Sequence, residues 1–245
     1  MLRTLRPMLV SATIVTALIS STLATAQDGR DKWFGAIKAS IGDVQIDSIS
    51  HGGGIGTGTL INGQIDGQLE DTTFDDYTAG LGVSLGRRMG NWQLETEFVY
   101  RYRTDWDLVA PTPSIQTITN VFSNIETNTL MFNVARRGVV SQFWSWELGA
   151  GIGLVQNDIE GDYIERRVPG IRPELVFKDD QSDTDFTYNV FAGVTRELGR
   201  TLTLNIRYRY IDLGDLEIGP FPNRPARATG EHTAQELQFS IERTF

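Results

Sequence analysis

The chain of 245 residues has no cysteine, only two histidines, and fewer basic than acidic residues. Without cysteine no disulfide framework is used, although an oxidising compartment is tolerated. The 22 Lys and Arg against 31 Asp and Glu give a formal net charge of −9, which excludes the basic face of a nucleic-acid-binding protein. Beyond residue 26 no run approaches the about 18 apolar residues of a transmembrane helix, so helical membrane spans are also excluded.

Residues 1–26 have the three parts of a secretory signal peptide. Arg3 and Arg6 form a basic start, an uncharged apolar run follows, and small residues at 24–26 provide a cleavage site after Ala26. The apolar run is shorter than the roughly 20 residues that a membrane anchor needs, and an uncleaved anchor is the alternative. We expect an exported mature chain of residues 27–245, in which the loss of two arginines changes the formal charge from −9 to −11.

Residues 233–245 alternate between apolar and polar side chains with the period of a β-strand. Leu237, Phe239 and Ile241 share one face with the final residue, Phe245, while glutamates and other polar residues occupy the opposite face. An amphipathic strand that closes on an aromatic residue indicates contact with lipid on one side and with a polar interior on the other. The alternative is an edge or core strand of a soluble sandwich.

Seven further segments repeat this alternation. The eight expected strands are residues 32–44, 76–88, 92–103, 123–137, 143–156, 184–198, 201–213 and 233–245. Three short turns, at 89–91, 138–142 and 199–200, alternate with four long loops, at 45–75, 104–122, 157–183 and 214–231. This order predicts an all-β fold, an eight-stranded antiparallel up-and-down transmembrane β-barrel that forms one domain over residues 27–245.

Aromatic residues gather at the ends of the expected strands. These residues are Trp33, Trp92, Trp144, Trp146, Tyr208, Tyr210 and Phe245. Amphipathic aromatic rings favour the two membrane–water interfaces, so we expect them to form interfacial girdles.

The polar faces of the expected strands carry charges of both signs. If the apolar faces contact lipid, the lumen receives Lys38, Glu95, Glu97, Arg101, Arg103, Glu147, Arg207, Arg209, Glu236 and Glu242, five cations and five anions. The interior of an eight-stranded barrel is just wide enough for side chains to fill it, and an unpaired buried charge costs several kcal/mol. We therefore predict an internal ion-pair network and a plugged lumen. The competing interpretation is a network that gates a narrow ion path.

The stretch 204–214, with the sequence LNIRYRYIDLG, resembles the Y-R-Y-x-D-L-G stretch of the opacity-protein and porin-like family of small outer-membrane barrels. The resemblance implies an eight-stranded barrel exposed at the cell surface, with a role in envelope integrity or adhesion. It also implies that the closing strand, through Phe239, Ile241 and Phe245, is the signal read by the barrel-insertion machinery. The long loop at 45–75 has no counterpart in this resemblance.

An enzymatic role is the least supported alternative. A serine–histidine lipid hydrolase needs a serine within hydrogen-bond reach of a histidine and an acid that orients it. The two histidines are His51, in the Gly-rich loop, and His232, which has Glu231 beside it but no serine nearby in the chain. Acidic clusters at 71–76 and 179–185 lack the spacing of a calcium loop, and basic pairs at 166–167 and 224–227 are interpreted as solvated loop residues. We therefore predict no catalytic residues, no metal and no cofactor.

Together, these observations predict a monomeric, non-enzymatic barrel in the outer membrane of a Gram-negative cell. Its expected partners are outer-membrane lipid and lipopolysaccharide, the barrel-insertion machinery, and a surface ligand that the sequence does not identify, with no nucleic acid. The alternatives are a narrow porin-like channel for ions or small solutes and, with less support, a lipid-acting hydrolase.

Overall fold

The computed structural model describes residues 31–52, 59–61, 64–66, 73–112, 117–167, 175–220 and 227–245. The predicted signal peptide at 1–26 and part of the predicted loop at 45–75 lie outside these residues. Among the described residues there is no helix with the length and apolar character that a membrane span requires.

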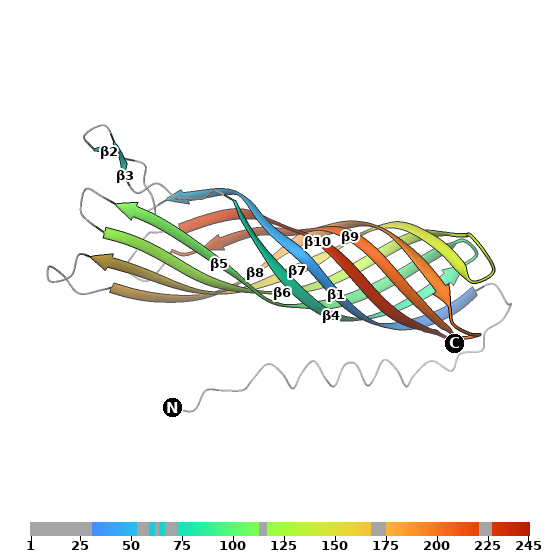
Figure 1. The fold of residues 1–245 in the computed structure, drawn as a ribbon. Helices are drawn as coiled ribbons and strands as arrows, with labels where there is room; N and C mark the ends of the chain where they lie inside the picture. Colours follow the sequence, from blue (N-terminus) through green and yellow to red (C-terminus); the bar gives the residue numbers. More distant parts are fainter. Residues whose placement is uncertain are drawn as a thin grey trace, which may run out of the picture.

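Eight long strands form a closed antiparallel barrel. They are β1 (Asp31–Gly52), β4 (Phe74–Met89), β5 (Trp92–Thr112), β6 (Thr117–Val139), β7 (Trp144–Arg167), β8 (Leu175–Glu197), β9 (Leu202–Ile218) and β10 (Arg227–Thr244). Each strand pairs with its neighbour in the chain, and β1 pairs with both β4 and β10 to close the ring. The predicted eight-stranded up-and-down barrel is therefore confirmed (Figure 1).

The two ends of the barrel differ. At one end, short turns join β4 to β5, β6 to β7 and β8 to β9, and the amide of Phe245 donates to the carbonyl of Trp33 at 3.0 Å. The other end carries the longer connections and a small hairpin of β2 (Thr59–Ile61) and β3 (Gln64–Asp66). Because outer-membrane barrels have short periplasmic turns and longer outer loops, the short-turn end is the inner end and the hairpin marks the outer end.

An apolar belt surrounds the inner half of the barrel. Its outward-facing side chains include Ile37, Ile41, Leu81, Phe98, Leu130, Phe132, Leu148, Ile152, Leu154, Val190, Val194, Phe239 and Ile241, all exposed. Aromatic residues flank this belt at the inner end, among them Trp33, Trp92, Trp144 and Phe245. Exposed apolar side chains in a continuous ring are stable only against lipid, so the belt marks the membrane-spanning part of the strands.

The strands are longer than the sequence predicted. The predicted loop at 104–122 is mostly the outer ends of β5 and β6, and the predicted loop at 157–183 is mostly those of β7 and β8. The predicted loop at 214–231 likewise contains the end of β9 and the start of β10. These three loop predictions were wrong because polar residues, which were assigned to loops, continue the strand alternation with their side chains pointing outward.

The alternation reverses its polarity in the outer half of the barrel. On β5, Glu95 and Glu97 point inward near the inner end, whereas Trp106 and Leu108 point inward near the outer end, with Asp105 and Asp107 exposed. The inward apolar residues form one cluster, the outer core, of Ile46, Ile49, Trp106, Leu108, Val121, Ile125, Ile159, Tyr163, Leu216, Ile218 and Ala228. Beyond the lipid the strands meet water, so the apolar face turns inward as in a soluble protein.

Strand pairing is interrupted at two places in the outer half. The β4–β5 ladder begins at Gly80 and Arg101, and the β8–β9 ladder begins at Tyr188 and Asp212, so the outer parts of these pairs have no ladder. The wall there divides into two four-stranded sheets, β9-β10-β1-β4 and β5-β6-β7-β8, that pack across the outer core.

At each interruption an aspartate side chain accepts a hydrogen bond from a backbone amide of the facing strand. The Asp76 carboxylate accepts from the Asp105 amide at 3.0 Å, and the Asp185 carboxylate accepts from the Asp215 amide at 3.2 Å. Asp76 and Asp185 come from the two acidic clusters noted in the sequence, and each thus satisfies a backbone donor where the strands no longer pair.

Candidate functional site

Charged side chains fill the lumen at the level of the apolar belt. They project inward from β1, β4, β5, β7, β9 and β10, and small residues on facing strands make room for them. A Cβ on Gly193 would approach the Glu147 carboxylate to 3.0 Å, and a Cβ on Gly149 would collide with the Phe191 ring. The inward glycines of the barrel are therefore part of the packing around the charges.

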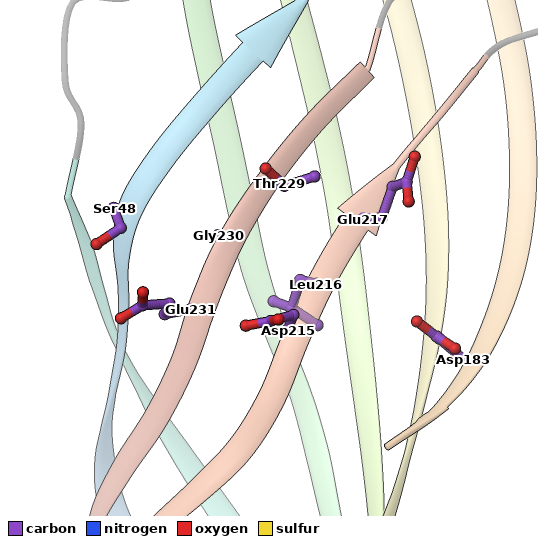
Figure 2. Close-up of a pocket in the computed structure, with 8 residues that line it drawn as sticks. All are labelled: Ser48, Asp183, Asp215, Leu216, Glu217, Thr229, Gly230 and Glu231. Carbon is purple, nitrogen blue, oxygen red and sulfur yellow. The ribbon is translucent and has the colours of Figure 1, made fainter. Parts of the chain in front are cut away.

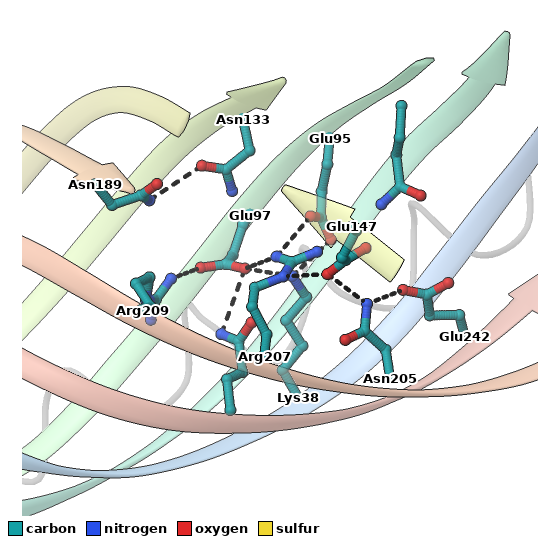
Figure 3. A network of polar contacts seen from close by, with 12 residues as sticks. Lys38, Glu95, Glu97, Asn133, Glu147, Asn189, Asn205, Arg207, Arg209 and Glu242 are labelled. Atoms are coloured by element: carbon teal, nitrogen blue, oxygen red, sulfur yellow. Dashed lines mark hydrogen bonds and ion pairs between the residues drawn. The ribbon is translucent and has the colours of Figure 1, made fainter. Parts of the chain in front are cut away.

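Arg207 lies at the centre of this group (Figure 3). Its Nε donates to Glu147 Oε1 at 2.7 Å and its Nη1 donates to Glu95 Oε2 at 3.1 Å. Its guanidinium also lies 4.1 Å from the centre of the buried Phe191 ring. Lys38 Nζ lies 2.6 Å from Glu95 Oε1 and also pairs with Glu97, so one lysine links two glutamates of β5.

Two arginines share one carboxylate on the outer side of Arg207. Arg209 pairs with Glu97 and donates from Nε to Glu236 at 2.9 Å. Arg101 pairs with Glu236 as well, and its Nη1 donates to the Thr129 hydroxyl at 2.9 Å. Glu236 therefore receives two cations and is the outer junction of the network.

Glu242 is the corresponding junction on the inner side. It pairs with Arg88, and the Asn205 amide donates to both Glu242, at 3.2 Å, and Glu147, at 2.9 Å. The contacts thus join side chains of six strands into one continuous set. We call it the lumen network: Lys38, Arg88, Glu95, Glu97, Arg101, Glu147, Arg207, Arg209, Glu236 and Glu242.

The lumen network differs from the predicted set in one exchange. Arg103 was expected in the lumen, but its side chain is 49% exposed and pairs with Asp105 at 3.1 Å on the outer surface. The β5–β6 register shifts between Arg101 and Thr104, and this bulge turns Arg103 outward. The prediction for Arg103 was wrong because a bulge breaks the period-two pattern without a sequence signal.

Arg88 was missed, although a signal was present. It is the last residue of the expected strand 76–88 and continues the inward parity of Gly82, Ser84 and Gly86, but it was not included among the predicted lumen charges. Arg137 also lies at the inner mouth, where Nη2 donates to Thr195 at 2.6 Å and Nη1 donates to Gln93 at 3.4 Å.

The proposed insertion signal lies on the lipid-facing side of the closing strand. Phe239, Ile241 and Phe245 are 40%, 56% and 52% exposed. Outward placement makes these side chains available to another macromolecule before insertion and to lipid afterwards. Their recognition by the insertion machinery stays a prediction.

His232 lies inside the barrel at the boundary between the lumen network and the outer core. It is 1% exposed, and within the described part of the chain neither ring nitrogen has a hydrogen-bond partner. Burial, together with the charge of Arg101, lowers the pKa of His232 to about 3, so the imidazole is neutral in the folded protein. A buried histidine in this state lacks the serine partner that the hydrolase alternative requires.

The outer surface carries an open, acidic groove along β9 and β10, bordered by Ser48 of β1 and Asp183 of β8 (Figure 2). Its volume is about 380 Å³, and its lining includes Asp183, Asp215, Glu217 and Glu231. These carboxylates point away from the outer core and toward solvent. The groove therefore gives this side of the outer half a negative surface.

The chain is similar to one protein family and to several solved structures. The family model described as outer membrane protein beta-barrel domain matches residues 13–245. No curated protein matches the chain. Among solved structures, Neisserial surface protein A is similar at 11% identity and a TM-score of 0.45, over 86% of this chain and 97% of that one. The attachment invasion locus protein Ail of Yersinia pestis is similar at 10% identity and a TM-score of 0.39, over 86% and 99%.

The network predicts a large stability cost for loss of its central cation. In Arg207→Met, Glu147 and Glu95 lose a partner while they remain buried, so the free energy of unfolding should fall by about 3–5 kcal/mol. The matched control is Arg103→Met, which removes an exposed pair and should cost less than about 1 kcal/mol. Urea unfolding in lipid vesicles, followed by tryptophan fluorescence, measures both. Equal changes for the two variants would contradict a stabilising role of the lumen network.

His232 predicts a pH dependence of stability. Its folded-state pKa, about 3, is below the unfolded value of about 6.5, so the unfolded chain takes up a proton first as the pH falls. The free energy of unfolding should therefore decrease as the pH falls from about 6.5 toward 3, by about 2 kcal/mol at pH ~5. Urea titrations at several pH values should show a shallower dependence in His232→Leu. The same slope in both proteins would rule out this origin.

Proposed function

The chain belongs to the family of outer membrane protein β-barrel domains, and we propose that it is a non-conducting, non-enzymatic barrel that holds a rigid, acidic extension at the cell surface. Its work would be structural support of the envelope and interaction with a partner outside the cell. On this proposal residues 1–26 are an export signal that is removed.

The lumen network is the observation that supports a closed barrel most strongly. Each of its five cations pairs directly with at least one of its five anions, and the side chains of Arg207, Arg209 and Glu236 are almost completely buried. A permeating ion would have to displace a partner from a buried, charge-balanced pair, which costs several kcal/mol. The network therefore favours a lumen that is closed to ions over one that conducts them.

The outer core supports a second closure. Above the network, apolar side chains from both outer sheets meet, and Trp106 at their centre is 0% exposed. A packed apolar layer gives an ion no replacement for its hydration shell. Two barriers of different chemistry thus lie in series along the barrel axis.

The outer half also supports a role at the surface. Its strands continue beyond the apolar belt and are held by the outer core, so the extension is an ordered sheet structure. Its outward side chains are polar and acidic, as at Asp105, Asp215 and Glu231. Such a surface is suited to water and to macromolecular contact, and rigid strands position the connecting loops for binding.

A narrow channel is the second candidate, and one observation favours it. Within the described residues, several atoms of the lumen have no hydrogen-bond partner, including Arg207 Nη2, Glu147 Oε2 and Gln93 Nε2. Polar atoms without a partner are positions where a permeating ion or proton could bind transiently. The same network then acts as a selective constriction.

Single-channel recording tests the proposal. The full chain, purified from the outer membrane of a Gram-negative host and inserted into a planar bilayer, should give no conductance steps, because both barriers are closed. Reproducible steps that change in Arg207→Met or Glu95→Gln, but not in Arg103→Met, would establish the channel instead. A heat-modifiable band on a detergent gel verifies that each sample is a folded barrel.

A further inference from the structure

Four arginines occupy equivalent positions at the inner end of the barrel. Arg87, Arg136, Arg196 and Arg243 lie near the inner ends of β4, β6, β8 and β10. All four are exposed and follow the outward parity of the apolar belt. The repeat therefore places one outward cation on every second strand.

Three of these arginines face a tryptophan across the sheet. The register pairs Arg87 with Trp33, Arg136 with Trp92, and Arg196 with Trp144; the fourth, Arg243, pairs with Leu202. The guanidinium carbon lies 5.9 Å from the ring centre in the first pair and 5.3 Å in the third. We refer to the three tryptophan pairs as the Trp/Arg rungs. In the first and third rungs the aromatic face is close enough to attract the cation and restrict its position.

The rungs lie where the apolar belt ends. Two residues further along the same strands, toward the outer end, the outward side chains are Leu85, Val134, Val194 and Ile241. Tryptophan rings prefer the headgroup level of a bilayer, and a long arginine side chain reaches from apolar surface to the polar boundary. The guanidinium groups thus lie at the depth of lipid phosphates.

The local charge at this level is positive. Lys32 and Arg200 are exposed near the same end, as is the acidic Glu197, and Asp31 begins β1 there. The outer half has the opposite sign, with the acidic groove along β9 and β10. The barrel is therefore polarised along its axis, with its cations at the inner rim.

We propose that the Trp/Arg rungs bind the phosphate groups of anionic glycerophospholipids in the periplasmic leaflet. A guanidinium presents planar paired donors that match two phosphate oxygens, and in the Arg87 and Arg196 rungs the tryptophan ring holds the guanidinium in place. Anionic lipid attracts each arginine near a membrane surface by about 1 kcal/mol, or about fivefold in affinity. The proposal does not depend on whether the lumen conducts.

Native mass spectrometry with a matched pair of variants tests this. The full chain, purified in detergent, is titrated with phosphatidylglycerol and with phosphatidylethanolamine of the same acyl chains. One variant carries Arg87→Gln, Arg136→Gln and Arg196→Gln; the control carries Arg103→Gln, Lys178→Gln and Arg227→Gln, three exposed cations of the outer half. Both variants lower the net charge by the same amount.

The wild-type protein and the control should bind phosphatidylglycerol with similar affinity and prefer it to phosphatidylethanolamine. The rung variant should lose about fivefold in affinity for each arginine removed, together with that preference. Should the triple variant fail to fold on a heat-modifiability gel, the single changes Arg136→Gln and Arg196→Gln should each lose about fivefold.

Three results would overturn the proposal. Equal losses in the rung variant and the control would mean that net charge alone acts. Unchanged binding in the folded rung variant would place the lipid elsewhere. Displacement of phosphatidylglycerol by millimolar inorganic phosphate would indicate a general phosphate site instead of a lipid site.

Discussion

An eight-stranded barrel encloses an interior that only its own side chains can fill, and the rest of this structure depends on how that space is filled. At the level of the membrane the outward face must be apolar, so the polar residues of each strand are confined to the lumen. Burial there requires that every charge has a partner, and Arg207, Glu147 and Glu236 show how shared contacts meet this requirement. The lumen network is thus a consequence of the fold as well as its main internal support.

The interior of the outer half must also be filled by side chains, but there these side chains are apolar. Once the strands leave lipid, water solvates their outward faces, and apolar residues such as Trp106 and Ile125 fill the interior. Two strand pairs lose their ladders in this region, and Asp76 and Asp185 bridge the interruptions. A membrane barrel thereby continues into a structure that resembles a two-sheet sandwich, with His232 buried at the transition.

Period-two alternation was sufficient to predict the strand number, the closure and most of the lumen charges, because side-chain direction in a strand follows parity. Parity fails at a bulge, which is why Arg103 was misplaced. Arg88 follows the inward parity of its expected strand, but this last residue before the turn was left out of the predicted lumen charges. The outer parts of the strands were predicted as loops because their outward residues are polar. Only a known membrane boundary distinguishes a strand that continues into water from a loop. The Trp/Arg rungs need the register between strands, which pairs Trp33 with Arg87 although they are far apart in sequence.

The most direct test of a sealed interior uses the absence of natural cysteine. Ser240→Cys reports on the lumen network and Ser123→Cys on the outer core, since both serines are buried, while the exposed Ser182→Cys serves as the reference. With a water-soluble maleimide applied to the folded protein in vesicles, only the Ser182→Cys protein should react, and all three should react after unfolding. Reaction of the Ser240→Cys or Ser123→Cys protein at the rate of the reference would show a water-filled interior and contradict the closed barrel.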